Sequence, residues 1–221
     1  LNDGPAGFLD DVRATDTYGD LVYIGGSGNG WAKNITIKNS HFERSGRQGI
    51  AITGAENVNI LDSYIGEVGR TVIDLEPSVV GGGARYVLFK GNTFGPCRHL
   101  LMSSGGVGPN VDDISFVENH LVGIGLKIKV RAADGSRRQN YRFLDNVSQM
   151  PVGLPVAALR FERVDGIEVS GNYQVMNDNR SMTAVSACES SGVSVHDNDF
   201  PGAAREFSTA SVCGPDTDPS E

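Results

Sequence analysis

Residues 46–77 read GRQGIAITGAENVNILDSYIGEVGRTVIDLEP, and the beginning of this stretch returns near its end. The segment GRQGIAI at 46–52 reappears as GRTVIDL at 69–75. Between the two copies lies a second short apolar run, VNI at 58–60, which a polar turn follows. Self-similarity at a spacing of this size is typical of solenoids built from short strands. The stretch therefore predicts one full rung, meaning one turn of a solenoid.

The second apolar run and its turn recur along the chain, at 35–42, 58–65, 86–94, 114–121, 141–148, 167–174 and 193–200. Aligned on the turn, one column holds only Ser or Asn: Ser40, Ser63, Asn92, Asn119, Asn146, Asn172 and Asn198. Neighbouring members of this column are 23 to 29 residues apart. A period that drifts in this way indicates rungs with loops of variable length.

The repeated runs are rich in Val and Ile, alternate apolar with polar residues, and end at Gly, Asn, Asp or Ser, as strands do. Helical periodicity is nearly absent, so the sequence predicts an all-β solenoid. We expect the Asn column to form the sharp corners, because Asn tolerates the left-handed backbone region. Stacked Asn side chains also hydrogen-bond to each other as a ladder. Two solenoids compete, a three-sheet right-handed β-helix and a left-handed helix of hexapeptides, and no hexapeptide register is visible.

The corners of the Asn92-Thr93-Phe94 type, together with the strand pattern, resemble the right-handed parallel β-helix superfamily of pectate lyases, polygalacturonases, alginate epimerases and phage tailspikes. This resemblance covers nearly the whole chain and implies a single-stranded, three-sheet solenoid of about seven rungs. It implies no particular reaction, because this architecture hosts many chemistries. The GRQGI and IDLEP segments resemble a subgroup of bacterial β-helix repeat proteins, for which no activity carries over.

Composition agrees with one elongated domain over 1–213, with residues 1–20 as an irregular cap or partial rung and 214–221 as a polar tail. The 29 glycines suit a protein made largely of corners, and the net charge of −8 argues against a nucleic-acid partner. No apolar run approaches the length of a membrane span, so we expect no membrane insertion. The chain begins at Leu1 without Met, which we interpret as a mature or trimmed product. We expect an extracellular monomer.

Connections after the first-sheet strands lengthen in the middle of the chain, at 76–85, 103–113 and 131–140. Insertions that gather on one edge of a solenoid usually line its binding face, so these rungs should border a groove. Alternation along the first-sheet strands predicts a row of outward residues: Ala51, Asp74, Glu76, Lys127, Lys129, Arg131, Arg160 and Glu162. The strand around Arg98 fits two registers. Stacking would place carboxylates on one rung and a Lys/Lys/Arg cluster two rungs away.

This row suggests a carbohydrate-active protein on an acidic polysaccharide. A lyase or C5-epimerase needs a base beside cations that neutralise a uronate, whereas an inverting hydrolase needs two carboxyl groups several ångströms apart. The catalytic candidates are Asp74, Glu76, Lys127, Lys129 and Arg160. The substrate-binding candidates are Arg47, Gln48, Arg70, Arg98, His99, Arg131, Glu162 and, as a sugar-stacking platform, Trp31.

Other interpretations of the same residues stay open. Opposite charges on neighbouring strands often serve only as cross-strand pairs, and a lone Trp on a loop often closes a local core. A non-catalytic carbohydrate-binding, structural or adhesion β-helix is therefore the alternative function. We expect no cofactor. Asp74 and Glu76 are weak candidates for a Ca²⁺ site, because they lack the dense oxygen cluster that calcium prefers.

Two of the three cysteines occupy matching places in TAVSACESS and FSTASVCGP, one rung apart. Stacked strands would bring Cys188 and Cys213 within reach of a disulfide. We predict this bridge, which suits an extracellular protein. The alternative is a pair of buried thiols in a cytosolic chain, because the odd Cys97 is unusual for a secreted protein.

Overall fold

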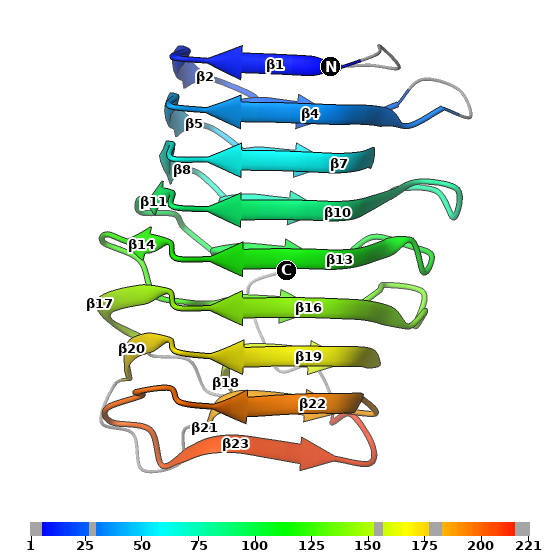
Figure 1. Ribbon diagram of the computed structural model, residues 1–221, viewed down its shortest axis with the longest axis vertical. Helices are drawn as coiled ribbons and strands as arrows, with labels where there is room; N and C mark the ends of the chain where they lie inside the picture. The colour runs from blue at the N-terminus through cyan, green and yellow to red at the C-terminus, as the bar shows by residue number, and fades with distance from the viewer. Residues whose placement is uncertain (1–5, 27–29, 153–156, 177–182, 215–221) are drawn as a thin grey trace.

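Three parallel sheets wind around a common axis in the computed structural model, which describes residues 6–26, 30–152, 157–176 and 183–214 (Figure 1). The chain visits the three sheets in the same order on successive rungs, so each strand pairs with the strand three places further along, except that β21 (Thr183–Cys188) pairs with β23 (Arg205–Ala210) on the last rung. In Figure 1 the front strands β1 (Gly7–Asp10) to β22 (Ser191–His196) point to the left and the strands behind them point to the right while the chain descends, which is the sense of a right-handed solenoid. The described residues contain no helix, and so none that is long and apolar enough to cross a membrane.

The strands of each sheet are short and lie in the order in which the chain makes them. The first sheet contains β1 (Gly7–Asp10), β4 (Ala32–Lys38), β7 (Gly54–Leu61), β10 (Gly83–Lys90), β13 (Val111–Val117), β16 (Arg138–Leu144), β19 (Val164–Ser170) and β22 (Ser191–His196). The second contains β2 (Arg13–Thr17), β5 (His41–Ser45), β8 (Tyr64–Val68), β11 (Thr93–Phe94), β14 (His120–Leu121), β17 (Val147–Val152) and β20 (Tyr173–Met176). The third contains β3 (Val22–Ile24), β6 (Ile50–Ile52), β9 (Ile73–Leu75), β12 (Met102–Ser104), β15 (Ile128–Val130), β18 (Ala157–Glu162), β21 (Thr183–Cys188) and β23 (Arg205–Ala210).

The sequence predicted an irregular segment at each end of the chain. Within 1–20, where we expected an irregular cap or partial rung, β1 and β2 pair with β4 and β5 as the start of the first rung. The expected polar tail lies outside the described residues except for Gly214.

Inward-facing side chains stack in columns that fill the interior. Ile37, Ile60, Phe89, Phe116 and Phe143 follow one another through five rungs of the first sheet. The rings of Phe89 and Phe116 have centroids 6.0 Å apart, and those of Phe116 and Phe143 are also 6.0 Å apart. Offset ring pairs of this kind contribute beyond the area that they bury. The core is therefore a set of side-chain stacks parallel to the axis.

The predicted ladder of polar side chains lies at the corner between the first and second sheets. The backbone N–H of each member donates to the side chain of the next, from Ser40 through to Asn198, at 2.9 to 3.0 Å. Each Asn from Asn92 onward also donates its amide to a backbone carbonyl of the preceding rung. Asn92, Asn119 and Asn146 are almost fully buried, so the ladder satisfies polar groups that water does not reach.

The left-handed backbone at this corner belongs to another residue than we expected. The residue directly before each of the seven ladder positions has a φ between 45° and 67°: Asn39, Asp62, Gly91, Glu118, Asp145, Gly171 and Asp197. Asn119 and the other ladder residues do not have positive φ. The prediction that the ladder Asn makes the left-handed bend is therefore wrong. The exposed neighbour makes the bend, and the buried Asn supplies the hydrogen bonds.

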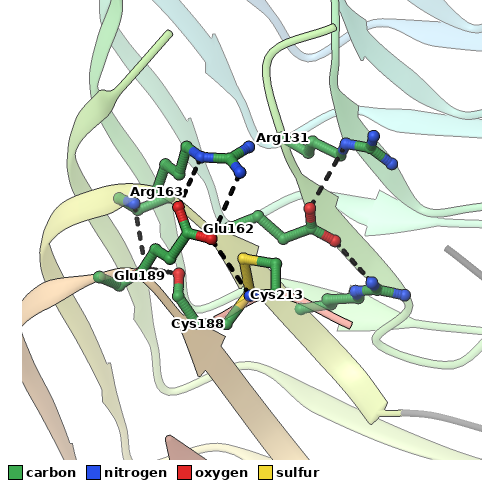
Figure 2. Close-up of a disulfide and its surroundings, with 9 residues drawn as sticks. Arg131, Glu162, Arg163, Cys188, Glu189 and Cys213 are labelled. Carbon is green, nitrogen blue, oxygen red and sulfur yellow. Dashed lines mark hydrogen bonds and ion pairs between the residues drawn. A yellow bond between two sulfur atoms is a disulfide. The ribbon is translucent and has the colours of Figure 1, made fainter. Parts of the chain in front are cut away.

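Cys188 and Cys213 form a disulfide with a Cα–Cα distance of 5.1 Å (Figure 2). Cys188 ends β21, and Cys213 follows β23, the next strand of the third sheet. Glu189 accepts a hydrogen bond from the Cys213 backbone N–H at 3.2 Å and forms an ion pair with Arg163 at 2.8 Å. The pairing agrees with the one-rung spacing in the sequence. Cys97 is a free, partly buried thiol.

Removing one Asn from the ladder should destabilise the solenoid. In Asn146→Ala, the buried backbone and side-chain N–H groups of Asn119 lose the acceptor that they contact at 3.0 and 2.9 Å. We expect the free energy of unfolding in urea to fall by about 2 to 3 kcal/mol, because buried donors without partners are costly. Asn59→Ala, on the outer face of the first sheet, should change it by less than about 0.5 kcal/mol. Equal losses in both variants would contradict a special role for the ladder.

Reducing the disulfide should loosen the last rung. The bridge closes a loop of 25 residues, and constraint of the unfolded chain by such a loop is worth about 3 kcal/mol. We expect a reductant to lower the melting temperature of the natural chain and of Cys97→Ser alike. The double variant Cys188→Ser/Cys213→Ser should have the lower melting temperature both with and without the reductant. A reductant effect that persists in the double variant would contradict the assignment.

Candidate functional site

The strands that the sequence analysis grouped as a first sheet, such as 50–52 and 73–75, belong to the third sheet of the structure. The outer face of this third sheet carries the row of residues that the sequence singled out. Strand pairing places Tyr23, Ala51, Asp74, Ser103, Lys129 and Arg160 in one column. The carboxylate and the cations are thus two strands apart, with Ser103 between them. The pairing also resolves the register of the fourth rung, because Met102 lies in the inward column with Ile73 and Ile128.

A groove of about 620 Å³ opens where the second and third sheets meet, from the second to the fourth rung. The side chains that define it are Gln48, Arg70, Thr71, Asp74, Glu76, Arg98 and His99, and backbone at Gly46 and Gly69 completes it. Six of these seven side chains were candidates from the sequence. The long loops were expected to border the groove, but short corner segments form this wall. The groove combines two carboxyl groups with two guanidinium groups and one imidazole.

Asp74, at the middle of β9, is the most perturbed group in the groove. Its side chain is only 7% exposed, and its Oδ2 accepts a hydrogen bond from Gln48 Nε2 at 3.0 Å. Burial, followed by the charge of Glu76, raises the pKa of Asp74 from 3.8 to about 7, although the Gln48 hydrogen bond opposes this. The negative charge of Asp20 and a hydrogen bond with Glu76 raise it further. A large fraction of Asp74 therefore holds a proton at neutral pH.

The interaction between Asp74 and Glu76 adds a second chemistry to the one that we expected of the pair. Their spacing along the strand had suggested the separated carboxyl groups of an inverting hydrolase. Such enzymes keep the two groups about 6.5 to 9.5 Å apart, so that a water molecule fits between them and the sugar. Glu76 acts on Asp74 through its charge and a hydrogen bond, both of which raise the pKa of Asp74. The pair therefore also offers a proton donor next to a second carboxyl group.

Arg70 and Arg98 bring positive charge to the same groove. Within the described ranges of the chain, neither guanidinium forms an ion pair, and both residues are exposed. The backbone N–H of His99 donates to Arg70 O at 3.4 Å, which stacks these residues on neighbouring rungs. Two guanidinium groups that have no ion-pair partner in the described chain, and that lie beside a protonated carboxyl, suit an anionic ligand.

The remaining charged candidates lie outside this groove. Glu162, which is 3% exposed at its side chain, contacts Arg160 at 2.6 Å and Arg131 at 3.4 Å. Figure 2 shows Arg131 beside Glu162, near the disulfide. Lys129 is buried in the outward column next to Arg160. Lys127 lies close enough to Cys97 to oppose the burial that raises the pKa of that thiol to about 11. These residues are not brought together with Asp74.

Two binding candidates occupy other places. The Arg47 guanidinium lies 3.4 Å from Asp20 and donates to Gln48 Oε1 at 3.2 Å. It therefore helps to position the Gln48 side chain, which lines the groove. Trp31 lines a second pocket of about 340 Å³ together with Tyr23, Thr53, Ser78 and Val79. Its indole Nε1 donates to Gly81 O at 2.8 Å.

Asp74 and Glu76 stay weak candidates for a Ca²⁺ site. Calcium takes six to eight oxygen ligands, and these two residues bring two carboxyl groups to the groove. Among the described residues, one group of three potential ligands meets within 4.8 Å, namely Glu162 with the two disulfide sulfurs. Sulfurs in a disulfide are not the thiolates that bind metal ions.

Sequence reasoning missed three contributors. Asp20 accepts a hydrogen bond from the Gln48 backbone N–H at 3.2 Å and so supports the residue that contacts Asp74. Thr71 lines the groove. Tyr23 faces outward in the same column as Asp74, and the alternation of Val22, Tyr23 and Ile24 was the signal that would have found it.

Comparison with known proteins supports the fold and no family. No protein-family model and no curated protein sequence matches the chain. A solved structure described as the Streptococcus pneumoniae surface protein and adhesin PfbA is similar, with a TM-score of 0.60, 14% identity and 92% of this chain covered. The match covers 66% of that adhesin chain, so this chain spans less than two thirds of it. A second structure of PfbA matches with a TM-score of 0.35 and 12% identity, over 90% of this chain and 72% of that one. At this identity the likeness shows a shared parallel β-helix.

Proposed function

We propose that this chain acts on an acidic polysaccharide by β-elimination, with Asp74 as the general acid. The observation that carries the proposal is a buried carboxyl that holds a proton near neutral pH, in a groove that also contains Arg70 and Arg98. An acid that is active at neutral pH needs a pKa near the working pH. Cations without protein partners are the groups that a uronate carboxylate requires.

Each residue of the groove has a role in this reaction. Arg70 and Arg98 hold the uronate carboxylate and stabilise the charge that spreads onto it when the neighbouring carbon loses its proton. His99 takes that proton as the base. The glycosidic C–O bond then breaks, a carbon–carbon double bond forms, and Asp74 protonates the departing oxygen. Glu76 keeps the proton on Asp74 through its negative charge.

A surface adhesion module is the second candidate, and one observation favours it. The likeness in fold at a TM-score of 0.60 is to a protein described as a surface adhesin. In that case the groove binds a sugar chain without cleaving it. Both candidates imply a protein outside the cell, and the disulfide supports this part of the proposal.

Removing the proton donor should abolish cleavage. We expect the natural chain to release unsaturated ends from a uronate polymer, detected as new ultraviolet absorbance, with kcat/KM falling above a pH of about 7 as Asp74 ionises. Asp74→Asn should lower kcat/KM by about 10²- to 10⁴-fold. Glu118→Gln, which changes an exposed carboxylate paired with Lys90 at 3.3 Å, should have no effect.

Three outcomes would decide between the candidates. Product formation that survives Asp74→Asn would contradict the role of Asp74. New reducing ends without unsaturated ends would indicate hydrolysis. Binding of a polymer without any product, across a panel of uronate polymers, would favour the adhesion module.

The same substitution should stabilise the fold at alkaline pH. The folded pKa of Asp74 lies near 7 and its ordinary value is 3.8, so the folded chain binds a proton that the unfolded chain releases. Stability therefore falls as pH rises between these values and stays lower above 7. Asn resembles the protonated acid, so we expect Asp74→Asn to gain on the order of 2 kcal/mol at pH 8 and little at pH 4. Urea unfolding at both pH values measures this, and a loss at pH 8 would contradict it.

A further inference from the structure

The second pocket differs in chemistry from the carboxyl groove. Tyr23 is 57% exposed and Val79 is 63% exposed, and together with Trp31 they give the pocket an aromatic and apolar wall beside the hydroxyl groups of Thr53 and Ser78. Every described residue that lines it is uncharged. A carboxylate placed there would lose water without gaining a cation, which is costly. The pocket therefore suits an uncharged ligand that has an apolar face.

The aromatic rings of this pocket are held in place before any ligand binds. The Tyr23 hydroxyl and Thr53 Oγ1 share a hydrogen bond of 2.8 Å, and the Trp31 indole is fixed by its bond to Gly81 O. A Cβ added at Gly25 would lie 2.9 Å from the Tyr23 ring, which shows that the ring packs over the Gly25 backbone. Rings that are already positioned lose little entropy on binding.

The two pockets are neighbours on the same sheet face. Tyr23 and Asp74 occupy one outward column with only Ala51 between them, so their backbones are about 10 Å apart. The segment from Asp74 to Val79 runs along both pockets, with Asp74 and Glu76 in the charged groove and Ser78 and Val79 in the aromatic pocket. Ala51, which lies between them, is fully buried and contributes no surface to either pocket. A disaccharide matches this span.

We propose that the aromatic pocket and the carboxyl groove are adjacent subsites for one polysaccharide in which uncharged sugars alternate with uronates. This inference rests on the proposed function and specifies its substrate class. The uncharged sugar stacks its apolar face on Tyr23 and Trp31, because aromatic faces favour such contacts. The uronate then lies beside Arg70 and Arg98. A polymer of uronates alone fills only the charged subsite in this way.

Binding measurements on the Asp74→Asn chain, which should not consume the polymers, test the proposal. The probes are hyaluronan and unsulfated chondroitin as alternating polymers, polygalacturonate as a uronate polymer and dextran as an uncharged one. We expect at least one alternating polymer to bind about tenfold more tightly than either of the other types. Tyr23→Ala should remove about tenfold of that affinity and leave polygalacturonate binding unchanged. Arg98→Gln should weaken both acidic types.

Matched variants separate binding from folding. Tyr86→Ala removes a tyrosine that is 50% exposed on the first sheet and should change nothing. Trp31→Phe keeps an aromatic ring and should weaken binding of the alternating polymer less than Tyr23→Ala does. If Tyr23→Ala weakens polygalacturonate equally, or has no effect on the alternating polymers, the two-subsite proposal is wrong while the proposed function stands. If none of the acidic polymers binds or is cleaved, both are wrong.

Discussion

Stacking of equivalent strands in register is the constraint on which the rest of this structure depends. Each rung alone is a set of strands of two to eight residues that cannot bury its own apolar side chains. Parallel pairing repeats every column at the spacing of neighbouring strands, about 4.8 Å, and the buried Asn ladder sets where each corner occurs. A slip of one residue would turn the inward column outward and would break the hydrogen bonds of the ladder at the same time. Packing of the apolar core and hydrogen bonding of the buried polar groups thus select the same strand register.

The same stacking creates the groove. Gln48, Asp74 and Glu76 come from two successive rungs, and His99 and Arg98 come from the rung after them. Burial of Asp74 beside Glu76 holds a proton on a carboxyl that would ionise in water near pH 4. Keeping an acid in this state reduces stability at alkaline pH, which is a common property of catalytic groups. The other charged cluster, around Glu162, pairs its charges internally and lies next to the disulfide.

With the neighbouring aromatic pocket included, the side chains on the outer face of the third sheet change in chemical character along the solenoid axis. Tyr23 stands at one end of the outward column, Asp74 in the middle, and Lys129 with Arg160 further on. In the two-subsite proposal, a polymer that follows this column meets apolar, acidic and basic surfaces in turn. Its recognition would then depend on the order of sugars more than on one sugar type.

The sequence by itself determined the solenoid, the ladder column, the outward row and the Cys188–Cys213 pairing, because a repeat with one rung per period converts sequence distance directly into position. It located the left-handed bend one residue too late, since Asp, Asn and Ser at adjacent positions carry similar local preferences. Only the tertiary structure decided that the Asp74 and Glu76 side chains meet, that Arg70 and Arg98 have no ion-pair partner within the described chain, and that Lys129 and Arg160 lie outside the groove. Column order follows from the repeat, whereas side-chain direction and burial depend on how neighbouring rungs and corners pack.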